Sequence, residues 1–344
     1  MDNSVISVSN LKKRFNLEAG FFAPIGRYVY AVNDVSFSIG KNETYGLVGE
    51  SGCGKTTTAR LMVRMYEADE GEIFYQGRNF GDNGNTSEVG RVVRENSAAI
   101  DVRKLKGLEF KRYREKVKYV FQDPARSLNP RMTVYEVLTS GARWSKAEKA
   151  PLREEAAAIL EEVGLSAADL ERRPAEFSGG QRQRISIARG LIMKPDLLIC
   201  DEVVSALDVS IQGQILNLLL DLRNNREISF LFIAHDLKVA SYFCDRIGVM
   251  YRGEIMEEAS AELLWKNHLH PYTELLFSSV GGGTPQATTI TNSAVNTAVT
   301  AETGQQAAFG CAFASRCPYA DEICLREKPL LKEAEAGHLV RCRR

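Results

Sequence analysis

Gly49-Glu50-Ser51-Gly52-Cys53-Gly54-Lys55-Thr56 is the stretch from which this 344-residue chain is best understood. It fits the pattern G-x-x-x-x-G-K-[ST], in which glycines let the backbone wrap a phosphate group while amide N–H groups point at it. The apolar run 44–48 before it predicts a buried strand, and residues 57–62 after it predict the start of a helix. Because the pattern needs this strand–loop–helix context, the stretch indicates a phosphate-binding loop.

The loop contains the side chains that nucleotide binding requires. We expect Lys55 to reach the β- and γ-phosphates and the hydroxyl of Thr56 to ligate Mg²⁺. The residues of this region that are expected to bind ATP are Gly49, Ser51, Gly52, Cys53, Gly54, Lys55, Thr56 and Thr57.

The composition predicts a globular protein of about two domains. Lys and Arg together number 44, as do Asp and Glu, so no net charge favours a nucleic-acid partner. No apolar run approaches the ~18 residues that span a bilayer. Residues 1–4 lack the pattern of a signal peptide, so a cytoplasmic location is expected.

Three apolar runs later in the chain each end in polar side chains. We interpret these runs as parallel strands, each of which delivers a catalytic candidate at its C-terminal end. Two successive carboxylates there fit a Mg²⁺ ligand and the base of a nucleotide hydrolase. The residues are Gln122 after the first run, Asp201 and Glu202 after the second, and His235 after the third.

A second anion-binding helix start is predicted at Ser178-Gly179-Gly180-Gln181, about 130 residues after the first. Ser178 is a good N-terminal cap, and the two glycines expose amides in front of the helix dipole.

These motifs, in this order, resemble those of the ATP-binding subunit of an ABC transporter, and the resemblance covers roughly residues 4–260. Within that family the chain is similar to the peptide-type importer ATPases, and nearer to the second of their two ATPase subunits. The finer likeness rests on the cysteine-bearing tail and on the segments Phe121-Gln122-Asp123-Pro124, Ser127-Leu128-Asn129-Pro130-Arg131, Ser205-Ala206-Leu207-Asp208-Val209-Ser210 and His270-Pro271-Tyr272-Thr273.

The resemblance implies an α/β fold. A P-loop ABC ATPase domain would combine a RecA-like core, an antiparallel β subdomain and a helical signature subdomain, followed by a small cysteine-containing C-terminal extension. The expected parts are the ATPase domain at 1–260 with its helical subdomain at about 125–190, a connecting helix with the His-Pro-Tyr motif at 261–280, a flexible linker at 281–310 and the extension at 311–344.

The resemblance also implies a mechanism in which two such domains close head to tail over two ATP molecules. The phosphate loop of one chain and the signature of the other would hold each nucleotide. The expected catalytic residues are Glu202 as general base, His235 at the γ-phosphate and Gln122 as a sensor. The expected Mg²⁺ residues are Thr56, Gln122 and Asp201, and those of the signature that bind ATP are Ser178, Gly179, Gly180 and Gln181.

ATP hydrolysis would power the import of di- or oligopeptides. The implied partners are a second ABC ATPase subunit in a heterodimer, two membrane-spanning permease subunits and an external binding protein. The chain would be peripheral at the cytoplasmic face of the inner membrane.

Nickel, glutathione or oligosaccharides are alternative cargoes. A non-transport ABC ATPase is a remote alternative, because residues 57–196 show no sustained heptads. A subunit without turnover is disfavoured by the intact Glu202 and His235.

Four of the seven cysteines, Cys311, Cys317, Cys324 and Cys342, cluster near the C-terminus. Clustered thiols in a cytosolic protein more often bind metal than form disulfides. The spacing lacks the C-x2-C of structural zinc, so an iron–sulfur cluster is favoured, with zinc or reduced thiols as alternatives. The tail resembles the C-terminal extension of peptide-importer ATPases, and this resemblance implies a [4Fe–4S] cluster. Replacing Cys317 is expected to release the metal without directly touching the phosphate site.

Two local features remain open. Phe22, Tyr28 and Tyr30 are candidates for stacking on adenine, although rings that merely pack on a sheet edge explain them equally well. Val203 stands where the family usually has proline, and we expect a slight change of geometry with activity retained.

Overall fold

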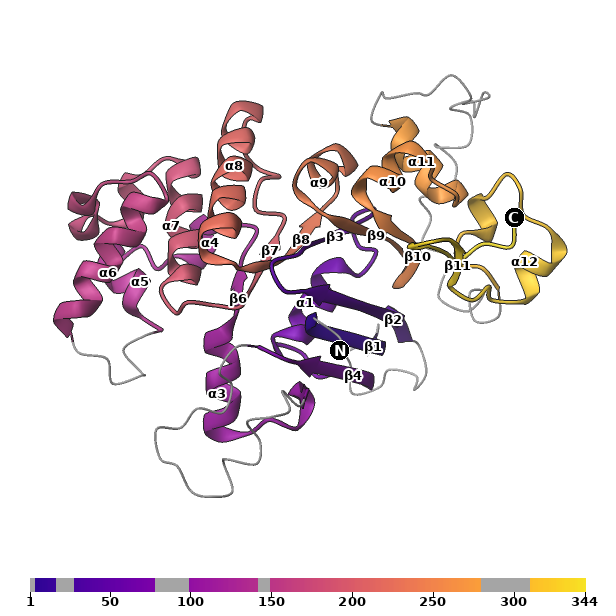
Figure 1. The fold of residues 1–344 in the computed structure, drawn as a ribbon, viewed down its shortest axis with the longest axis horizontal. Coiled ribbons are helices and arrows are strands. Elements are labelled where there is room, and N and C mark those ends of the chain that lie inside the picture. The colour runs from indigo at the N-terminus through magenta and orange to yellow at the C-terminus, as the bar shows by residue number, and fades with distance from the viewer. Residues whose placement is uncertain (1–3, 17–27, 78–98, 142–148, 280–309) are drawn as a thin grey trace, which may run out of the picture.

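The computed structural model describes residues 4–16, 28–77, 99–141, 149–279 and 310–344 (Figure 1). Phe22 and all but the last residue of the predicted linker 281–310 lie outside these ranges.

An eight-stranded sheet forms the centre of the molecule, in the order β11-β12-β10-β9-β3-β8-β7-β6. The five strands from β9 to β6 are parallel, and β10, β12 and β11 continue the sheet antiparallel. The strands are β3 (Thr44–Val48), β6 (Val117–Val120), β7 (Leu197–Asp201), β8 (Ser229–Ala234), β9 (Arg246–Tyr251), β10 (Glu254–Ser260), β11 (Lys332–Glu335) and β12 (His338–Val340).

The central parallel strands β3, β7 and β8 are buried at every position. Helices cover a parallel sheet on both faces, which is why these strands are nearly continuous apolar runs in the sequence. The three runs predicted to be parallel strands are β6, β7 and β8, and the parallel pairing of β6 with β7 and of β7 with β8 confirms this prediction.

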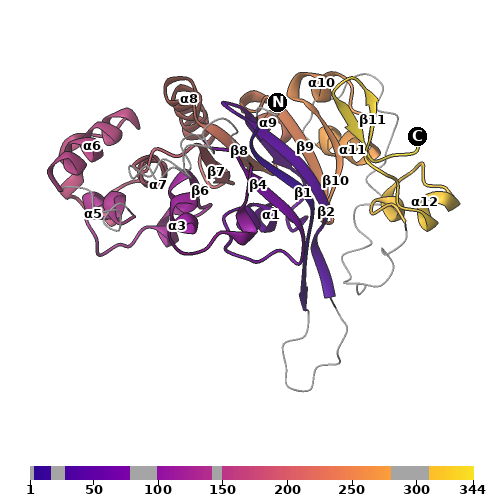
Figure 2. The ribbon, with the colours of Figure 1, turned by 60° about the horizontal axis from the view of Figure 1, so that its bottom comes forward.

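A smaller antiparallel sheet, in the order β2-β1-β4-β5, forms the predicted β subdomain. It lies beside α1 and the main sheet, as both ribbon views show (Figures 1 and 2). Apolar side chains of β1, β2 and β4 share one core with α1 and with one face of β3, β7 and β8. The elements are β1 (Ser4–Asn16), β2 (Tyr28–Gly40), β4 (Glu70–Tyr75), β5 (Ile100–Asp101) and α1 (Lys55–Met62).

The helices between β6 and β7 gather at one end of the molecule, and the cysteine-bearing C-terminal elements lie at the other end (Figure 1). The former comprise α4 (Pro124–Ser127), α5 (Val134–Thr139), α6 (Lys149–Glu162) and α7 (Gly179–Leu191), with the 3₁₀ turns η3 (Ala167–Glu171) and η4 (Pro174–Glu176). The remaining helical elements are η1 (Val102–Lys104), α3 (Gly107–Lys116), α8 (Val209–Arg226), α9 (Leu237–Phe243), α10 (Ala261–Lys266), α11 (Pro271–Ser279), η6 (Ala314–Arg316) and α12 (Glu322–Arg326).

The C-terminal extension is built into the main sheet, because β12 pairs with β10 through Glu257 and Val340. A buried polar cluster reinforces this junction. The Nε2 atom of His338 lies 2.7 Å from Oε1 of Glu257, and the Glu257 carboxylate also accepts the backbone N–H groups of Leu269 and His270. Burial raises the pKa of Glu257, but these hydrogen bonds outweigh it and hold the pKa below its usual value.

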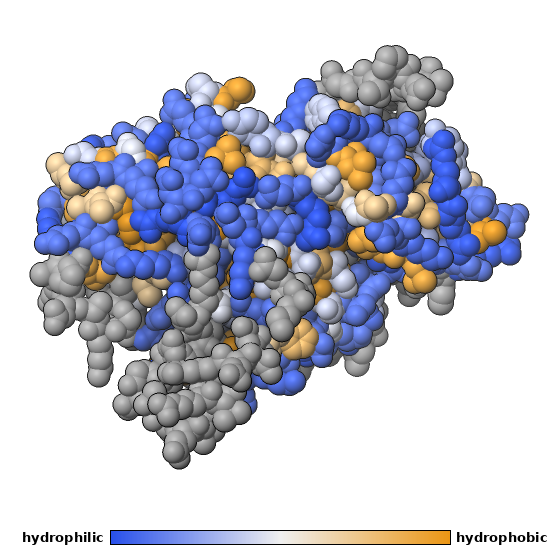
Figure 3. Space-filling view, viewed as in Figure 1, coloured by the Kyte–Doolittle hydropathy of each residue, from blue (hydrophilic) through white to orange (hydrophobic). Residues whose placement is uncertain are grey.

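None of the helices in the described ranges is long and apolar enough to cross a membrane. The face drawn in Figure 3 is mostly hydrophilic, with apolar side chains in small separate groups.

Candidate nucleotide site

The phosphate loop lies between β3 and α1, as the sequence predicts. Gly54 has a left-handed φ of 113°, and a Cβ atom there would lie 2.1 Å from the carbonyl oxygen of Ala31 on β2. Only glycine fits this close approach at this backbone angle. The pattern therefore requires glycine at this position for a steric reason, because the loop is pressed against the β subdomain.

Lys55 is almost fully buried, at 4% exposure. Its Nζ atom donates to the carbonyl oxygens of Gly49 and Glu50 at 2.7 and 2.9 Å. The ammonium group thus lies inside the loop, where its charge faces the space that the loop encloses. This is the position from which a lysine can pair with phosphate oxygens.

The predicted residues after β6, β7 and β8 come together at one edge of the sheet. Thr56 Oγ1 donates to Oδ1 of Asp201 at 2.9 Å, which joins the start of α1 to the end of β7. Gln122 Nε2 donates to Oε2 of Glu202 at 2.7 Å, which joins the end of β6 to the same place. His235 directly follows β8, with an exposed side chain. The structure thus brings Thr56 to Asp201 and Gln122 to Glu202.

Glu202 has a left-handed backbone, with φ at 48°. Its N–H donates to the carbonyl oxygen of Ile233 at 3.1 Å, which fixes this conformation beside β8. A non-glycine residue held at positive φ costs free energy, and such residues gather at functional sites. Val203, the next residue, stands where the family usually has proline. It is 2% exposed, and its side chain packs in the apolar core.

Tyr119 is a site residue that the sequence analysis missed. Its hydroxyl donates to Oδ2 of Asp201, while Thr56 binds the other carboxylate oxygen. Burial and the neighbouring carboxylate raise the pKa of Tyr119, so it remains a neutral donor. The sequence feature that indicates this role is the position of Tyr119, three residues before Gln122. It lies on β6, which pairs with the strand that carries Asp201.

The signature segment caps α7, as predicted from Ser178. Ser178 Oγ accepts the N–H of Gln181, and Oε1 of Gln181 accepts the N–H of Ser178, so the two residues form a capping box. Ser178 and Gly179 are exposed. In the described part of the chain no hydrogen bond or ion pair joins this segment to the phosphate loop of the same molecule.

Of the aromatic candidates for adenine stacking, Tyr28 and Tyr30 lie on β2 and are exposed. The guanidinium of Arg14 lies over the ring of Tyr28, 4.7 Å from its centroid. One face of Tyr28 is therefore covered, whereas Tyr30 is half exposed.

The four tail cysteines line one cavity of about 220 Å³, together with His270 and Phe313. No disulfide joins them. Burial, and to a lesser degree the three other thiols, raise the pKa of Cys311. Among the residues that the structure describes, no three His, Cys, Asp or Glu side chains are arranged so that they could hold a single metal ion. The predicted iron–sulfur site is thus not supported as a formed metal site.

The tail also touches the phosphate loop, which the sequence analysis did not foresee. Arg316, next to Cys317, donates from both terminal nitrogens to the two carboxylate oxygens of Glu50, at 2.9 Å each. The N–H of Glu50 donates to the hydroxyl of Tyr272 at 2.9 Å. Cys317 is one residue away from this contact, so replacing it would reach the phosphate loop only through its neighbour Arg316.

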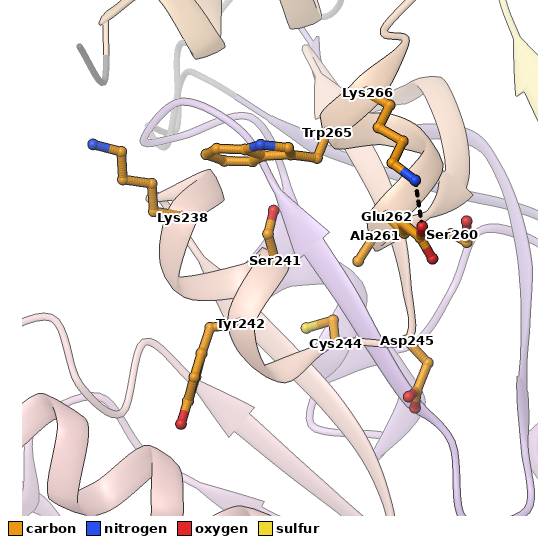
Figure 4. A pocket seen from close by; sticks show the side chains of 10 residues that line it. All are labelled: Lys238, Ser241, Tyr242, Cys244, Asp245, Ser260, Ala261, Glu262, Trp265 and Lys266. Atoms are coloured by element: carbon orange, nitrogen blue, oxygen red, sulfur yellow. Dashed lines mark hydrogen bonds and ion pairs between the residues drawn. The ribbon is translucent and has the colours of Figure 1, made fainter. Parts of the chain in front are cut away.

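A larger hollow of about 600 Å³ lies elsewhere, between α9 and α10 (Figure 4). Trp265 and Tyr242 flank it, and Lys266 pairs with Glu262 at its margin. No residue of the predicted nucleotide site lines this hollow, so its size does not make it the candidate site.

Comparison with known proteins agrees with this geometry. The family model "ABC transporter" matches residues 32–205, and the model "oligopeptide/dipeptide transporter, C-terminal region" matches residues 256–324. The chain is 40% identical over 343 residues to the oligopeptide transport ATP-binding protein AppF of Bacillus subtilis, covering 98% of this chain and 97% of that protein. It is 44% identical over 282 residues to OppF of the same organism, covering 81% and 83%.

Solved structures show the same fold. The ATP-binding cassette MJ0796, in a dimeric post-hydrolysis state with ADP and Pi, matches with a TM-score of 0.60 and 25% identity, over 74% of this chain and 98% of that one. Another match is cbiO1 of Clostridium perfringens, part of the transporter complex cbiONQ, with a TM-score of 0.61, 22% identity and coverage of 77% and 92%. The chain belongs to the ABC transporter family, as one of its ATP-binding, ATP-hydrolysing cassettes.

Proposed function

We propose that this chain hydrolyses ATP to power the import of di- or oligopeptides. One observation carries the proposal: a single chain joins the sheet edge that gathers Thr56, Asp201, Gln122 and Glu202 to the C-terminal region typical of oligopeptide and dipeptide transporters. The two Bacillus subtilis relatives are named for oligopeptide transport. These findings favour peptides over nickel, glutathione or oligosaccharides as cargo.

The phosphate loop would bind the nucleotide through its amides and through Lys55, whose ammonium group lies inside the loop. The side-chain oxygens of Thr56, Asp201 and Gln122 are the hard donors that Mg²⁺ prefers, and they lie at the same edge of the sheet. Bound Mg²⁺ would neutralise charge on the β- and γ-phosphates. Tyr119 orients the Asp201 carboxylate from its other side.

Glu202 is the proposed general base. Its carboxylate, held by Gln122, would accept the proton of the attacking water, and His235 would hold the γ-phosphate side of the site. Proton transfer by a positioned base contributes about 10²–10⁴-fold to a rate. The left-handed backbone at Glu202 fixes the direction in which this carboxylate leaves the sheet.

The signature residues Ser178, Gly179, Gly180 and Gln181, of which all but the half-buried Gly180 are exposed, would complete the site of a second cassette. Support comes from the exposure of Ser178, Gly179 and Gln181 and from the dimeric state named for MJ0796. We propose a heterodimer with another ABC ATPase subunit. It would be peripheral on the cytoplasmic face of the membrane, bound to two permease subunits and supplied by an external binding protein.

The uptake of a labelled tripeptide tests this function. A strain that lacks this chain should lose tripeptide uptake, and the wild-type chain should restore it, whereas Lys55→Ala should not. Uptake of nickel and of an oligosaccharide serves as the control and should be unaffected. If tripeptide uptake survives the deletion while one of the other uptakes is lost, the cargo assignment is wrong.

We also propose that the four tail thiolates hold an iron–sulfur cluster. The shared cavity of about 220 Å³ supports this, because a polynuclear cluster needs four thiolates spread around a space. Within the extension, the N–H of Cys311 donates to the carbonyl oxygen of Cys324, which holds the backbones of these two cysteines together. A bound cluster would supply cross-links between Cys311, Cys317, Cys324 and Cys342.

Metal analysis tests the cluster. The anaerobically purified full chain should contain about four iron atoms and absorb broadly near ~400 nm, and Cys317→Ser should lose both signals. Cys244→Ser is the matched control, since Cys244 is buried in the ATPase core away from this cavity. One zinc per chain, or iron that is retained in Cys317→Ser, would contradict the proposal.

A further inference from the structure

Glu50 is a carboxylate within the phosphate loop, where negative charge disfavours a nucleotide. Its side chain is 40% exposed and its partner Arg316 is 41% exposed. The two side chains meet in a bidentate pair with both nitrogen–oxygen distances at 2.9 Å. Paired forks of this kind are the strongest and most directional ion pairs that side chains form. Arg316 therefore neutralises the one acidic side chain of the loop.

The backbone of Glu50 is held as well. Its N–H donates to the hydroxyl of Tyr272, while its carbonyl oxygen accepts from Lys55 Nζ at 2.9 Å. Tyr272 is fully buried, and its hydroxyl is aimed at the loop from the start of α11. Both the backbone and the side chain of Glu50 thus have partners from the C-terminal region.

Aromatic packing makes this support rigid. Phe313 is 1% exposed, and its ring lies 5.3 Å from Tyr251 and 5.4 Å from Tyr272, centroid to centroid. Arg316 is carried by the next turn, η6, and its guanidinium lies 5.6 Å from the rings of both Tyr251 and Phe313. The arginine is therefore anchored on buried rings before it reaches Glu50.

We infer that Arg316 and Tyr272 are positioning residues of the nucleotide site, which hold the phosphate loop through Glu50 and neutralise its carboxylate, so that the C-terminal extension sets the affinity of the loop for MgATP. The inference rests on the proposed role of the loop in ATP binding. It goes further, because it gives the extension a role in nucleotide affinity that does not depend on whether a metal is bound.

The test measures the dissociation constant for MgATP by calorimetry, with the full chain carrying Glu202→Gln to slow hydrolysis. Arg316→Gln leaves the Glu50 charge unpaired and should weaken binding by about threefold to tenfold. Adding Glu50→Gln removes that charge and should recover most of the loss. Arg316→Lys, which keeps the charge without the fork, should fall in between.

Arg326→Gln is the matched control, because Arg326 lies on α12 of the same extension and pairs with the exposed Glu322. It should leave MgATP affinity unchanged. Since the Glu50–Arg316 pair is partly exposed, the effect of Arg316→Gln should shrink in high salt. Tyr272→Phe, which removes only the acceptor for the Glu50 N–H, should also weaken binding.

A purely structural role predicts a different pattern. Arg316→Gln would then lower the unfolding temperature, and Glu50→Gln would not rescue MgATP binding. The inference is overturned if Arg316→Gln binds MgATP like the parent chain, or if the double variant binds as weakly as Arg316→Gln alone. Lys55→Ala tests the proposed function of the loop separately from the role of Arg316. If this variant keeps full MgATP affinity, the proposal that the loop binds ATP is wrong.

Discussion

Glu202→Gln is expected to lower steady-state ATP hydrolysis by about 10²–10⁴-fold while MgATP binding is retained. The amide is nearly isosteric with the carboxylate, and its oxygen can still accept from Gln122 Nε2, so the geometry at the end of β7 is preserved. What is lost is the ability to accept a proton. Phosphate release and equilibrium MgATP binding are measured on the same preparation. Together they distinguish a loss of hydrolysis from a loss of binding.

Glu262→Gln is the control for this variant. Glu262 lies on α10 with 79% exposure and pairs with Lys266, so the same chemical change there should affect neither measurement. Because hydrolysis ends the closed state, Glu202→Gln should also accumulate MgATP-bound dimers in the presence of its partner subunit, detectable by size-exclusion chromatography. Turnover above one tenth of the wild-type rate would show that another group is the base.

The sequence predicts most of the nucleotide site because the site lies where strands end. Continuous apolar runs identify buried parallel strands, and the rule that such strands place the next residue at one edge gathers Gln122, Asp201 and Glu202. Ser178 as a helix cap is equally local, since capping depends on residues three positions apart. In each case the chemistry and the pattern that reveals it lie in one short segment.

What the sequence does not predict are contacts between distant segments. Glu50 and Arg316 belong to different motifs and are joined only by the way the extension packs against the phosphate loop. Tyr272 was noted as part of the His-Pro-Tyr motif, but its contact with the loop depends on the placement of α11. Glu257 on β10 accepts the N–H groups of Leu269 and His270 just before α11, and the pairing of β12 with β10 places the extension. These contacts join distant segments, so no local pattern in the sequence reveals them.

Gly54→Ala is the second large effect that we expect. The new Cβ would lie 2.1 Å from the carbonyl oxygen of Ala31, a backbone atom that cannot move away without shifting β2. Overpacking costs about 1–3 kcal/mol, and the positive φ of 113° adds roughly 1–2 kcal/mol for a residue with a Cβ atom. Together these costs of about 2–5 kcal/mol correspond to a loss of about 30- to 4,000-fold in MgATP affinity, if the free loop relaxes away from the conformation that binds the nucleotide.

Gly52→Ala is the matched comparison, because Gly52 also has a positive φ, at 79°, but a Cβ atom there meets nothing within 4 Å. The two variants share the backbone strain and differ in the steric overlap. In urea unfolding, the midpoint should fall clearly further for Gly54→Ala than for Gly52→Ala. Equal midpoints would mean that the loop is not pressed against β2, since backbone strain alone would then explain both variants.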